Sequence, residues 1–257
     1  MTTEQTPALT LPRHGGGRGI AVRMVQRLWP LPAIYVAMLP AGLLRAYADD
    51  IGLPVRQHFN ALERLLYAPE QTTWLQKLDF EWLRLAAAWT YASWFVLPLI
   101  VGLPLLVFRP GEFWRLGAFL VLFYYLAMPL FLLYPLSPPW LAHPEVHRTL
   151  AAYFEEMTRD SNPYAAMPSL HAAMPAAAAL WYGWRHPYSR VLWAYAGLIG
   201  FAVVYGGEHY VADVLAGFLF AALVYRAAVA LRLPLLPKRA ALIVELSSGR
   251  AELRKAS

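Results

Sequence analysis

The stretch Ala166-Met167-Pro168-Ser169-Leu170-His171 opens one apolar run of this chain, and Gly206-Gly207-Glu208-His209-Tyr210-Val211-Ala212-Asp213 opens another. Both runs are long enough to enter a membrane as helices, yet each begins with ionisable side chains. A charged side chain at the centre of a bilayer costs about 2.5–3.5 kcal/mol on insertion scales, so such residues generally mark functional sites. The two stretches therefore predict an all-α membrane protein with functional groups at the starts of two helices.

The composition agrees with a membrane protein. Of the 257 residues, 59% are hydrophobic and 15% are charged, whereas a soluble domain carries about 25% charged residues. The 10 Trp, 15 Tyr and 12 Phe residues suit aromatic belts at the two membrane surfaces. There is no cysteine, which excludes disulfides and thiol chemistry. The net charge of +6 follows the expected membrane topology, and we expect no nucleic-acid partner.

Six apolar segments predict a six-transmembrane-helix bundle. They are residues 29–47, 85–108, 116–136, 169–184, 191–205 and 209–231. A spanning helix needs about 20 residues, so the first, fourth and fifth segments are short. Short helices are expected to begin inside a cavity below the membrane surface, where the surrounding protein shields them from lipid.

The basic residues predict the orientation in the membrane. Fifteen of the 22 Lys and Arg residues lie before the first segment, after the second and fourth, and from the end of the sixth onward. Cytoplasmic loops carry the excess of Lys and Arg. Both termini are therefore placed in the cytoplasm of a cell or inner membrane, and the two motifs on the exoplasmic or periplasmic side.

Two segments have alternative interpretations. Arginines before residues 29–47 and Ala46-Tyr47-Ala48 at their end resemble a cleavable signal peptide, although the prolines of the run and Arg45 argue against cleavage. Residues 49–84 form a long exoplasmic connection in which Leu and Trp recur at helical spacing. This pattern predicts interfacial amphipathic helices, which serve either as a lid or as a lateral gate for lipid.

The lengths of the intervening segments bring the two motifs together. From His171 to Trp184 the chain runs 14 residues, and from Val191 to Tyr205 it runs 15. As helices these stretches measure about 21 and 22 Å, so the chain returns to nearly the depth that it left. The N-termini of the fourth and sixth segments are then neighbours, and their backbone N–H groups favour a bound phosphate.

The side chains in these motifs suit phosphoryl transfer. His209 and Asp213 are four residues apart, so they share one helical face and the carboxylate can orient the imidazole. His209 is then the candidate nucleophile, forming a phosphohistidine, and His171 the candidate general acid. Ser169 is expected to donate a hydrogen bond to the phosphate. The alternatives are structural polar contacts or a zinc site, but zinc catalysis normally needs three ligands and their supporting contacts.

These motifs resemble those of the type 2 phosphatidic acid phosphatase superfamily, which includes membrane lipid phosphatases and soluble vanadium haloperoxidases. The resemblance covers residues 85–231. The family's Pro-Ser-x-His motif matches Pro168-Ser169-Leu170-His171, and its His-x-x-x-Asp motif matches His209 and Asp213. The resemblance implies that His209 is the nucleophile, that His171 is the acid, that Asp213 orients His209, and that no metal or other cofactor is needed.

The chain also departs from the family pattern. Residues 133–140 lack the family's Lys and Arg-Pro motif, and Ala202 and Val203 stand where the last motif has Ser-Arg. Two phosphate-binding cations are therefore missing. The Pro-Pro-Trp run that ends at residue 140, Asn162-Pro163 and the Gly-Glu-His-Tyr run at 207–210 are similar to the inositolphosphotransferase branch, which resembles inositol phosphorylceramide synthases.

Other basic residues are expected to replace these cations. Arg148 and Arg159 are the nearest candidates by chain position, and Lys77 and Arg84 are further options. Each can equally be a solvated side chain or a contact to lipid headgroups. Glu208, next to the candidate nucleophile, can tune the pocket, bind a polyol hydroxyl or lie on the surface.

The sequence therefore predicts a metal-independent membrane enzyme that acts on a lipid-linked phosphate. Residues 1–28 form a disordered cytoplasmic tail, 29–232 the six-helix catalytic domain, and 233–257 a second cytoplasmic tail. The first hypothesis is inositolphosphotransferase-like headgroup transfer to an alcohol acceptor. The alternatives are a phosphatase acting on phosphatidic acid or prenyl diphosphate, and a catalytically silent membrane scaffold or transporter.

Overall fold

The computed structural model describes residues 30–46, 54–56, 63–151, 153 and 163–237, so the predicted tail at 1–28 and most of the one at 233–257 lie outside it. Helices dominate the described residues, and the β-pairing there consists of two isolated bridges that join Leu136 to Arg56 and to Ala165. The elements are α2 (Pro30–Ala46), α4 (Glu63–Leu66), α5 (Glu70–Gln76), α6 (Glu81–Ser93), η1 (Trp94–Val96), α7 (Leu97–Phe108), α8 (Pro110–Leu133), α9 (Pro139–Ala142), α11 (Leu170–Tyr182), α12 (Pro187–Tyr205) and α13 (Val211–Ala230).

Four helical stretches of the described chain are long and apolar enough to cross a membrane, which identifies an integral membrane protein. They are Glu81–Phe108, Pro110–Leu133, Pro187–Tyr205 and Val211–Ala230. The other two predicted segments, 29–47 and 169–184, correspond to α2 with 17 residues and α11 with 13. Six spans are therefore not confirmed, because these two helices are shorter than the four candidates.

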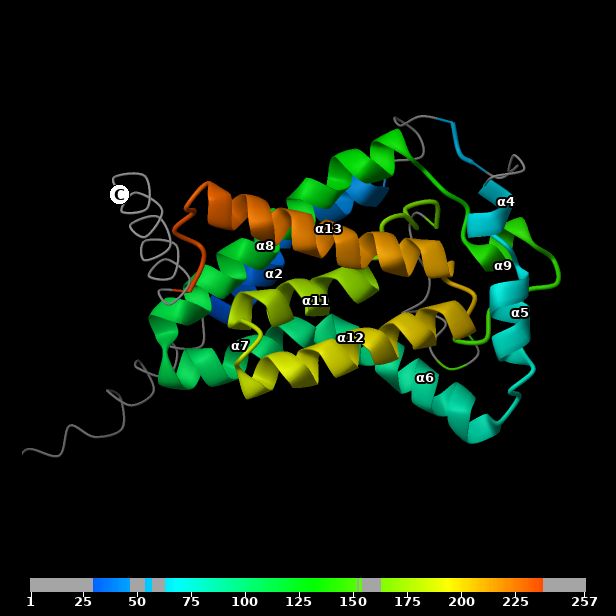
Figure 1. Ribbon diagram of the computed structural model, residues 1–257, viewed down its shortest axis with the longest axis horizontal. Coiled ribbons are helices and arrows are strands. Elements are labelled where there is room, and N and C mark those ends of the chain that lie inside the picture. The colour runs from blue at the N-terminus through cyan, green and yellow to red at the C-terminus, as the bar shows by residue number, and fades with distance from the viewer. Residues whose placement is uncertain (1–29, 47–53, 57–62, 152, 154–162, 238–257) are drawn as a thin grey trace, which may run out of the picture.

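Helix α11 lies within the bundle, which explains how it can be short. Its 13 residues extend about 20 Å, less than the roughly 30 Å of a bilayer core. It packs against α8, α12 and α13, and Figure 1 shows it between its neighbours. Six of its 13 residues are alanines, and all six are fully buried, among them Ala172, Ala173 and Ala176. Small residues allow membrane helices to approach closely, so α11 can be enclosed by protein.

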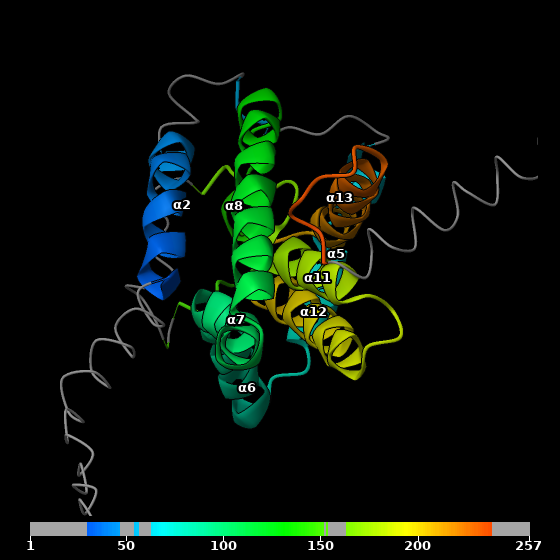
Figure 2. The same ribbon diagram turned by 90° about the vertical axis from the view of Figure 1, so that its left-hand side faces the viewer.

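The ends of the bundle differ in character. The starts of α11 and α13 point toward the end that carries α4, α5 and α9 (Figure 1). The α7–α8 and α11–α12 connections and the end of α13 lie at the opposite end, and these contain Arg109, Arg185 and Arg232 among other basic residues. Figure 2 shows α2 and α8 side by side at one flank of the bundle.

Helix α5 connects two loops at the end that contains the motifs. The Gln76 side-chain amide donates to the backbone carbonyls of His147 and Tyr205, at 2.7 and 2.9 Å. Its carbonyl accepts from the backbone N–H of His147 at 3.1 Å, and Gln71 accepts from the N–H of Val211 at 3.3 Å. The loop around residue 147 and both sides of the α12–α13 turn are thereby fixed to one short helix.

Candidate active site

The starts of α11 and α13 are joined through their backbones. The N–H of Ser169 donates to the carbonyl of Asp213 at 3.0 Å. Gly217, one turn further along α13, allows this approach, because a Cβ atom there would lie 2.5 Å from the Ser169 carbonyl oxygen. The motifs that contain Ser169 and Asp213 are thus in direct contact, although they are distant in sequence.

The turn between α12 and α13 directs two motif side chains into the site. Gly207 has a φ of +77°, and a Cβ atom there would lie 2.9 Å from the carbonyl oxygen of His147. Its own carbonyl accepts from the N–H of Trp140 at 3.1 Å. This conformation favours glycine, and the residues that follow it, Glu208 and His209, line a cavity.

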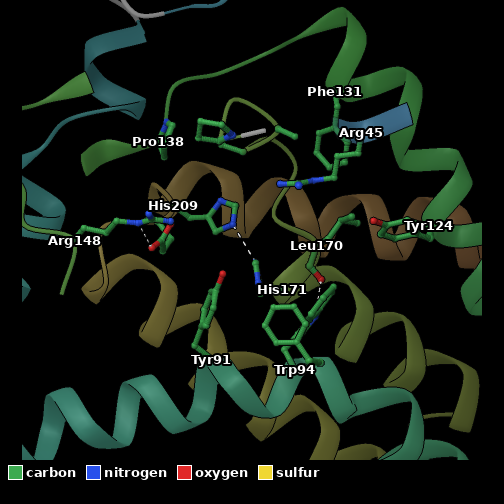
Figure 3. Close-up of a pocket in the computed structure, with 15 residues that line it drawn as sticks. Arg45, Tyr91, Trp94, Tyr124, Phe131, Pro138, Arg148, Leu170, His171 and His209 are labelled. Atoms are coloured by element: carbon green, nitrogen blue, oxygen red, sulfur yellow. Dashed lines mark hydrogen bonds and ion pairs between the residues drawn. The ribbon is translucent and has the colours of Figure 1, made fainter. Parts of the chain in front are cut away.

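His171, His209 and Asp213 form a continuous row (Figure 3). Nδ1 of His171 lies 3.3 Å from Nε2 of His209. On the other side of that ring, Nδ1 lies 3.4 Å from Oδ2 of Asp213. The same carboxylate oxygen accepts from the backbone N–H of Tyr210 at 2.9 Å. The Asp213 carboxylate therefore both caps the start of α13 and orients the ring of His209.

The burial of this row is unusual for ionisable groups. Among the described residues, His209 and Asp213 are the only histidine and acidic or basic side chains that are buried. Oδ1 of Asp213 has no hydrogen-bond partner within the described part of the chain. Ionisable groups buried in this way make the row the candidate active site of the described chain.

Aromatic side chains fix the ring of His171. Tyr91 of α6 stacks on it with centroids 4.7 Å apart, and Trp94 of η1 lies at the same distance at a tilt of 47°. The Trp94 indole N–H also donates to the carbonyl of Leu170 at 3.3 Å. Sequence reasoning did not identify this pair. The feature of the sequence that could have identified them is their spacing of three residues, which places both side chains on one helical face.

The row of side chains faces a cavity of about 280 Å³. The lining combines polar and charged groups with a wall of aromatic and apolar side chains. It consists of Arg45, Tyr91, Trp94, Phe95, Tyr124, Phe131, Pro138, Arg148, Pro163, Ala165, Ala166, Leu170, His171, Glu208 and His209. Figure 3 shows these residues around the two histidines.

The predicted phosphate-binding residues occupy different places. Arg148 lines the cavity, whereas Ser169 is fully buried and is not one of the lining residues. Lys77 and Arg84 do not line the cavity either, and Arg84 forms ion pairs with two acidic neighbours. Arg159 lies outside the described residues. A phosphate contact by Ser169 or Arg159 stays a prediction.

Arg148 forms an ion pair at the wall of the cavity. Its Nε donates to Glu208 at 2.8 Å, and a terminal nitrogen of its guanidinium group reaches the other carboxylate oxygen at 3.3 Å. The guanidinium carbon lies 4.4 Å from the centroid of the Trp140 ring. The Pro-Pro-Trp run therefore contacts the site through Trp140 and through Pro138, which also lines the cavity. Glu208 neutralises much of the charge that Arg148 brings.

Arg45 is a lining residue that sequence reasoning did not assign to the site. In the sequence, Arg45 stands out only as a basic residue at the end of the first predicted segment. In the structure it belongs to α2 and reaches the same cavity as the histidines. No group of three His, Cys, Asp or Glu side chains suited to holding a metal ion is found within the described ranges.

The comparisons with known proteins identify a family. The family model described as the PAP2 superfamily matches residues 59–227, which is more than half of the chain. The matched region contains His171, His209 and Asp213 but excludes α2. The chain matches no curated protein and no solved structure.

Proposed function

This chain belongs to the PAP2 superfamily, whose members are generally phosphatases that act on lipid phosphates, and we propose that it transfers a phosphoryl group from a membrane lipid through a phosphohistidine on His209. The observation that carries the proposal is the row formed by Asp213, His209 and His171 beside a cavity. A carboxylate, a nucleophile and a proton donor are the groups that this chemistry needs.

The geometry supports a specific proton arrangement. If Nδ1–H of His209 donates to Asp213, the lone pair lies on Nε2, the nitrogen that faces His171. The contact between the rings then has Nδ1–H of His171 as its donor. His171 acts as the acid in its doubly protonated form, so that release of one proton leaves a neutral imidazole. The phosphoryl group displaces the contact between the two rings before Nε2 of His209 attacks phosphorus. The separations of 3.3 and 3.4 Å are long for hydrogen bonds, as is common in catalytic sites before substrate binds.

The proposed reaction has two balanced steps. In the first, Nε2 of His209 forms a bond to phosphorus while the bond from phosphorus to the leaving oxygen breaks, and His171, as an imidazolium, gives that oxygen a proton and becomes neutral. In the second, an acceptor hydroxyl attacks phosphorus, the bond between phosphorus and His209 breaks, and the acceptor proton passes to His171. Catalysis then depends on positioning and on stabilising charge on the phosphoryl oxygens.

We propose that the acceptor is an alcohol, as in inositolphosphotransferase-like headgroup transfer. The support is Glu208, whose carboxylate lines the cavity next to His209 and can accept hydrogen bonds from hydroxyl groups. Hydrolysis is the second candidate, because phosphatases are the general activity of the superfamily. We place the site on the exoplasmic side with both termini in the cytoplasm, because the arginine-containing turns lie at the opposite end of the bundle.

The decisive experiment is product analysis in detergent micelles. Wild type and His209→Ala are incubated with phosphate-labelled phosphatidic acid, prenyl diphosphate and phosphatidylinositol, with and without alcohol acceptors. His143→Gln is the matched control, because this histidine lies outside the cavity lining. We expect wild type and His143→Gln to turn over one lipid, and His209→Ala to lose turnover while still eluting as folded protein.

The products separate the candidate functions. A new labelled lipid that appears only with an acceptor supports headgroup transfer, and free phosphate released without one supports hydrolysis. Equal turnover by His209→Ala and wild type rules out the phosphohistidine. If neither protein turns over any lipid in the panel, the silent scaffold becomes the better reading of the chain.

A further inference from the structure

Helix α2 has one buried face, and Arg45 lies on it. Ile34 and Ala41 are buried, and Met38 packs against the core between them. Arg45 follows Ala41 by four residues, so it continues the same stripe. The opposite face carries Val36, Leu39 and Leu43, which are all about 60% exposed. The packing of α2 therefore turns the charged residue toward the bundle and the apolar residues toward the surface.

Contacts with neighbouring elements hold α2 in this orientation. Ile34 packs so closely on α8 that a Cβ atom at Gly117 would lie 2.7 Å from its Cδ1. The hydroxyl of Tyr125 on α8 donates to the carbonyl of Ala37 at 3.0 Å, and that of Tyr35 donates to the carbonyl of Phe95 at 3.1 Å. These contacts fix the first half of the helix, and the buried Ala41 continues the same face toward Arg45.

The Arg45 side chain extends into the cavity that the two histidines line. Figure 3 shows it extended into the cavity toward His171 and His209. Its guanidinium carbon lies 5.9 Å from the centroid of the Phe131 ring, which forms part of the wall. The guanidinium group and the two histidine rings thus share one cavity.

The cavity wall carries three side chains of fixed charge, two of them arginines. Of the described residues that line the cavity, Arg45, Arg148 and Glu208 carry fixed charges. Arg148 and Glu208 form an ion pair with each other. The second arginine of the lining, Arg45, comes from α2. A phosphate group carries negative charge on oxygens that need such a partner, and the developing charge in phosphoryl transfer increases that need.

We propose that Arg45 binds the phosphoryl oxygens of the substrate through two hydrogen bonds from its guanidinium group. This inference rests on the proposed function and assigns to α2, which lies outside the matched residues 59–227, a part of the active site. Arginine suits the role because its planar fork matches two oxygens, whereas lysine offers a single point charge. Arg45 thereby supplies a positive charge in place of the two cations that the sequence lacks.

Orthovanadate binding tests the proposal without requiring turnover. Vanadate is a phosphate-like oxyanion, and its affinity for purified protein in detergent is measured by line broadening in vanadium NMR. Arg45→Gln is compared with wild type and with Arg109→Gln, an exposed arginine at the opposite end of the bundle. We expect Arg45→Gln to weaken binding about tenfold or more, the loss expected for a charged hydrogen-bonding partner, and Arg109→Gln to match wild type.

Three outcomes overturn the assignment of Arg45. They are equal vanadate affinity in Arg45→Gln and wild type, equal loss in Arg45→Gln and Arg109→Gln, and no vanadate binding by wild type at millimolar concentration. If Arg45→Gln does not give folded protein, Arg45→Lys decides, because wild-type affinity there contradicts the two-bond contact. Lipid turnover that needs His209 but not Arg45 leaves the proposed function standing. Vanadate binding that needs Arg45 in a protein without turnover supports Arg45 alone.

Discussion

The carboxylate of Asp213 serves two neighbours through one oxygen. Oδ2 accepts the backbone N–H of Tyr210 and lies 3.4 Å from the ring of His209. We predict that Asp213→Asn lowers kcat by about 10³–10⁴-fold, because an amide cannot hold the same tautomer or stabilise an imidazolium. The measurement is turnover of the lipid identified by product analysis.

The same substitution is expected to leave the fold intact. Asparagine keeps an oxygen for the N–H of Tyr210 and removes a buried charge, so the midpoint of thermal unfolding should change little. An Asp213→Asn protein that retains wild-type kcat contradicts the orienting role. A protein that loses activity together with its unfolding transition indicates that the carboxylate serves mainly to cap α13.

At the level of single residues, the sequence predicts the ionisable side chains that stand at the edges of apolar runs. His171, His209 and Asp213 are ionisable residues at the edges of apolar runs, so their types and spacing are visible without a fold. Tyr91 and Trp94 could not be separated from the many aromatic residues of the chain, because only packing shows that they enclose His171.

For the cations, chain position was a poor guide. Arg148 does reach the cavity, but its pairing with Glu208 depends on how the loop before α11 meets the α12–α13 turn. Arg45 looked like a basic residue at the edge of the membrane. The stripe formed by residues 34, 38, 41 and 45 was the available signal, and its value depended on knowing that this face is buried.

Among the elements, the contact between α11 and α13 is the one that holds the motifs together. We predict that Gly217→Ala destabilises the protein by about 1–3 kcal/mol and lowers the unfolding midpoint by about 2–10 °C, because the added methyl group would meet the Ser169 carbonyl. The added methyl group would also lengthen the hydrogen bond from the N–H of Ser169 to the carbonyl of Asp213. The measurement is thermal unfolding in detergent, followed by circular dichroism.

Gly197 on α12 provides the matched control for this change. A Cβ atom there has no neighbour within 4 Å, so Gly197→Ala should leave the midpoint unchanged or raise it slightly through helix propensity. Equal midpoints for the Gly217 and Gly197 variants would contradict the close contact between α11 and α13.

The lengths of the elements were harder to predict than their existence. Each of the six predicted segments overlaps one helix or, at 85–108, the continuous run of α6, η1 and α7, because apolar runs are visible in sequence. The sequence does not show that α11 is enclosed by α8, α12 and α13, which removes the need for a full span. The role of α5 was also hidden, because Gln71 and Gln76 act through backbone groups distant in sequence.

For the whole molecule, the placement of basic residues predicts the orientation in the membrane. The chain has no cysteine, so single cysteines report on their positions without background labelling. We predict that an impermeant maleimide labels Lys77→Cys in intact cells and labels Gly111→Cys only after the membrane is opened. Both positions are exposed, and they lie at opposite ends of the bundle. The reverse pattern would place the site in the cytoplasm, and labelling of both in intact cells would contradict the span between them.

The volume of the cavity has a consequence for how a lipid would be selected. About 280 Å³ is slightly below the range of roughly 300–1,000 Å³ in which proteins enclose small molecules. Such a space accommodates the polar end of a lipid, whereas its fatty tails have to stay in the bilayer beside the exposed leucines of the helices. Tail length and saturation would then contribute little to recognition. A protein built in this way would process mixed natural lipids as one population, distinguished by the group that is attached to phosphorus.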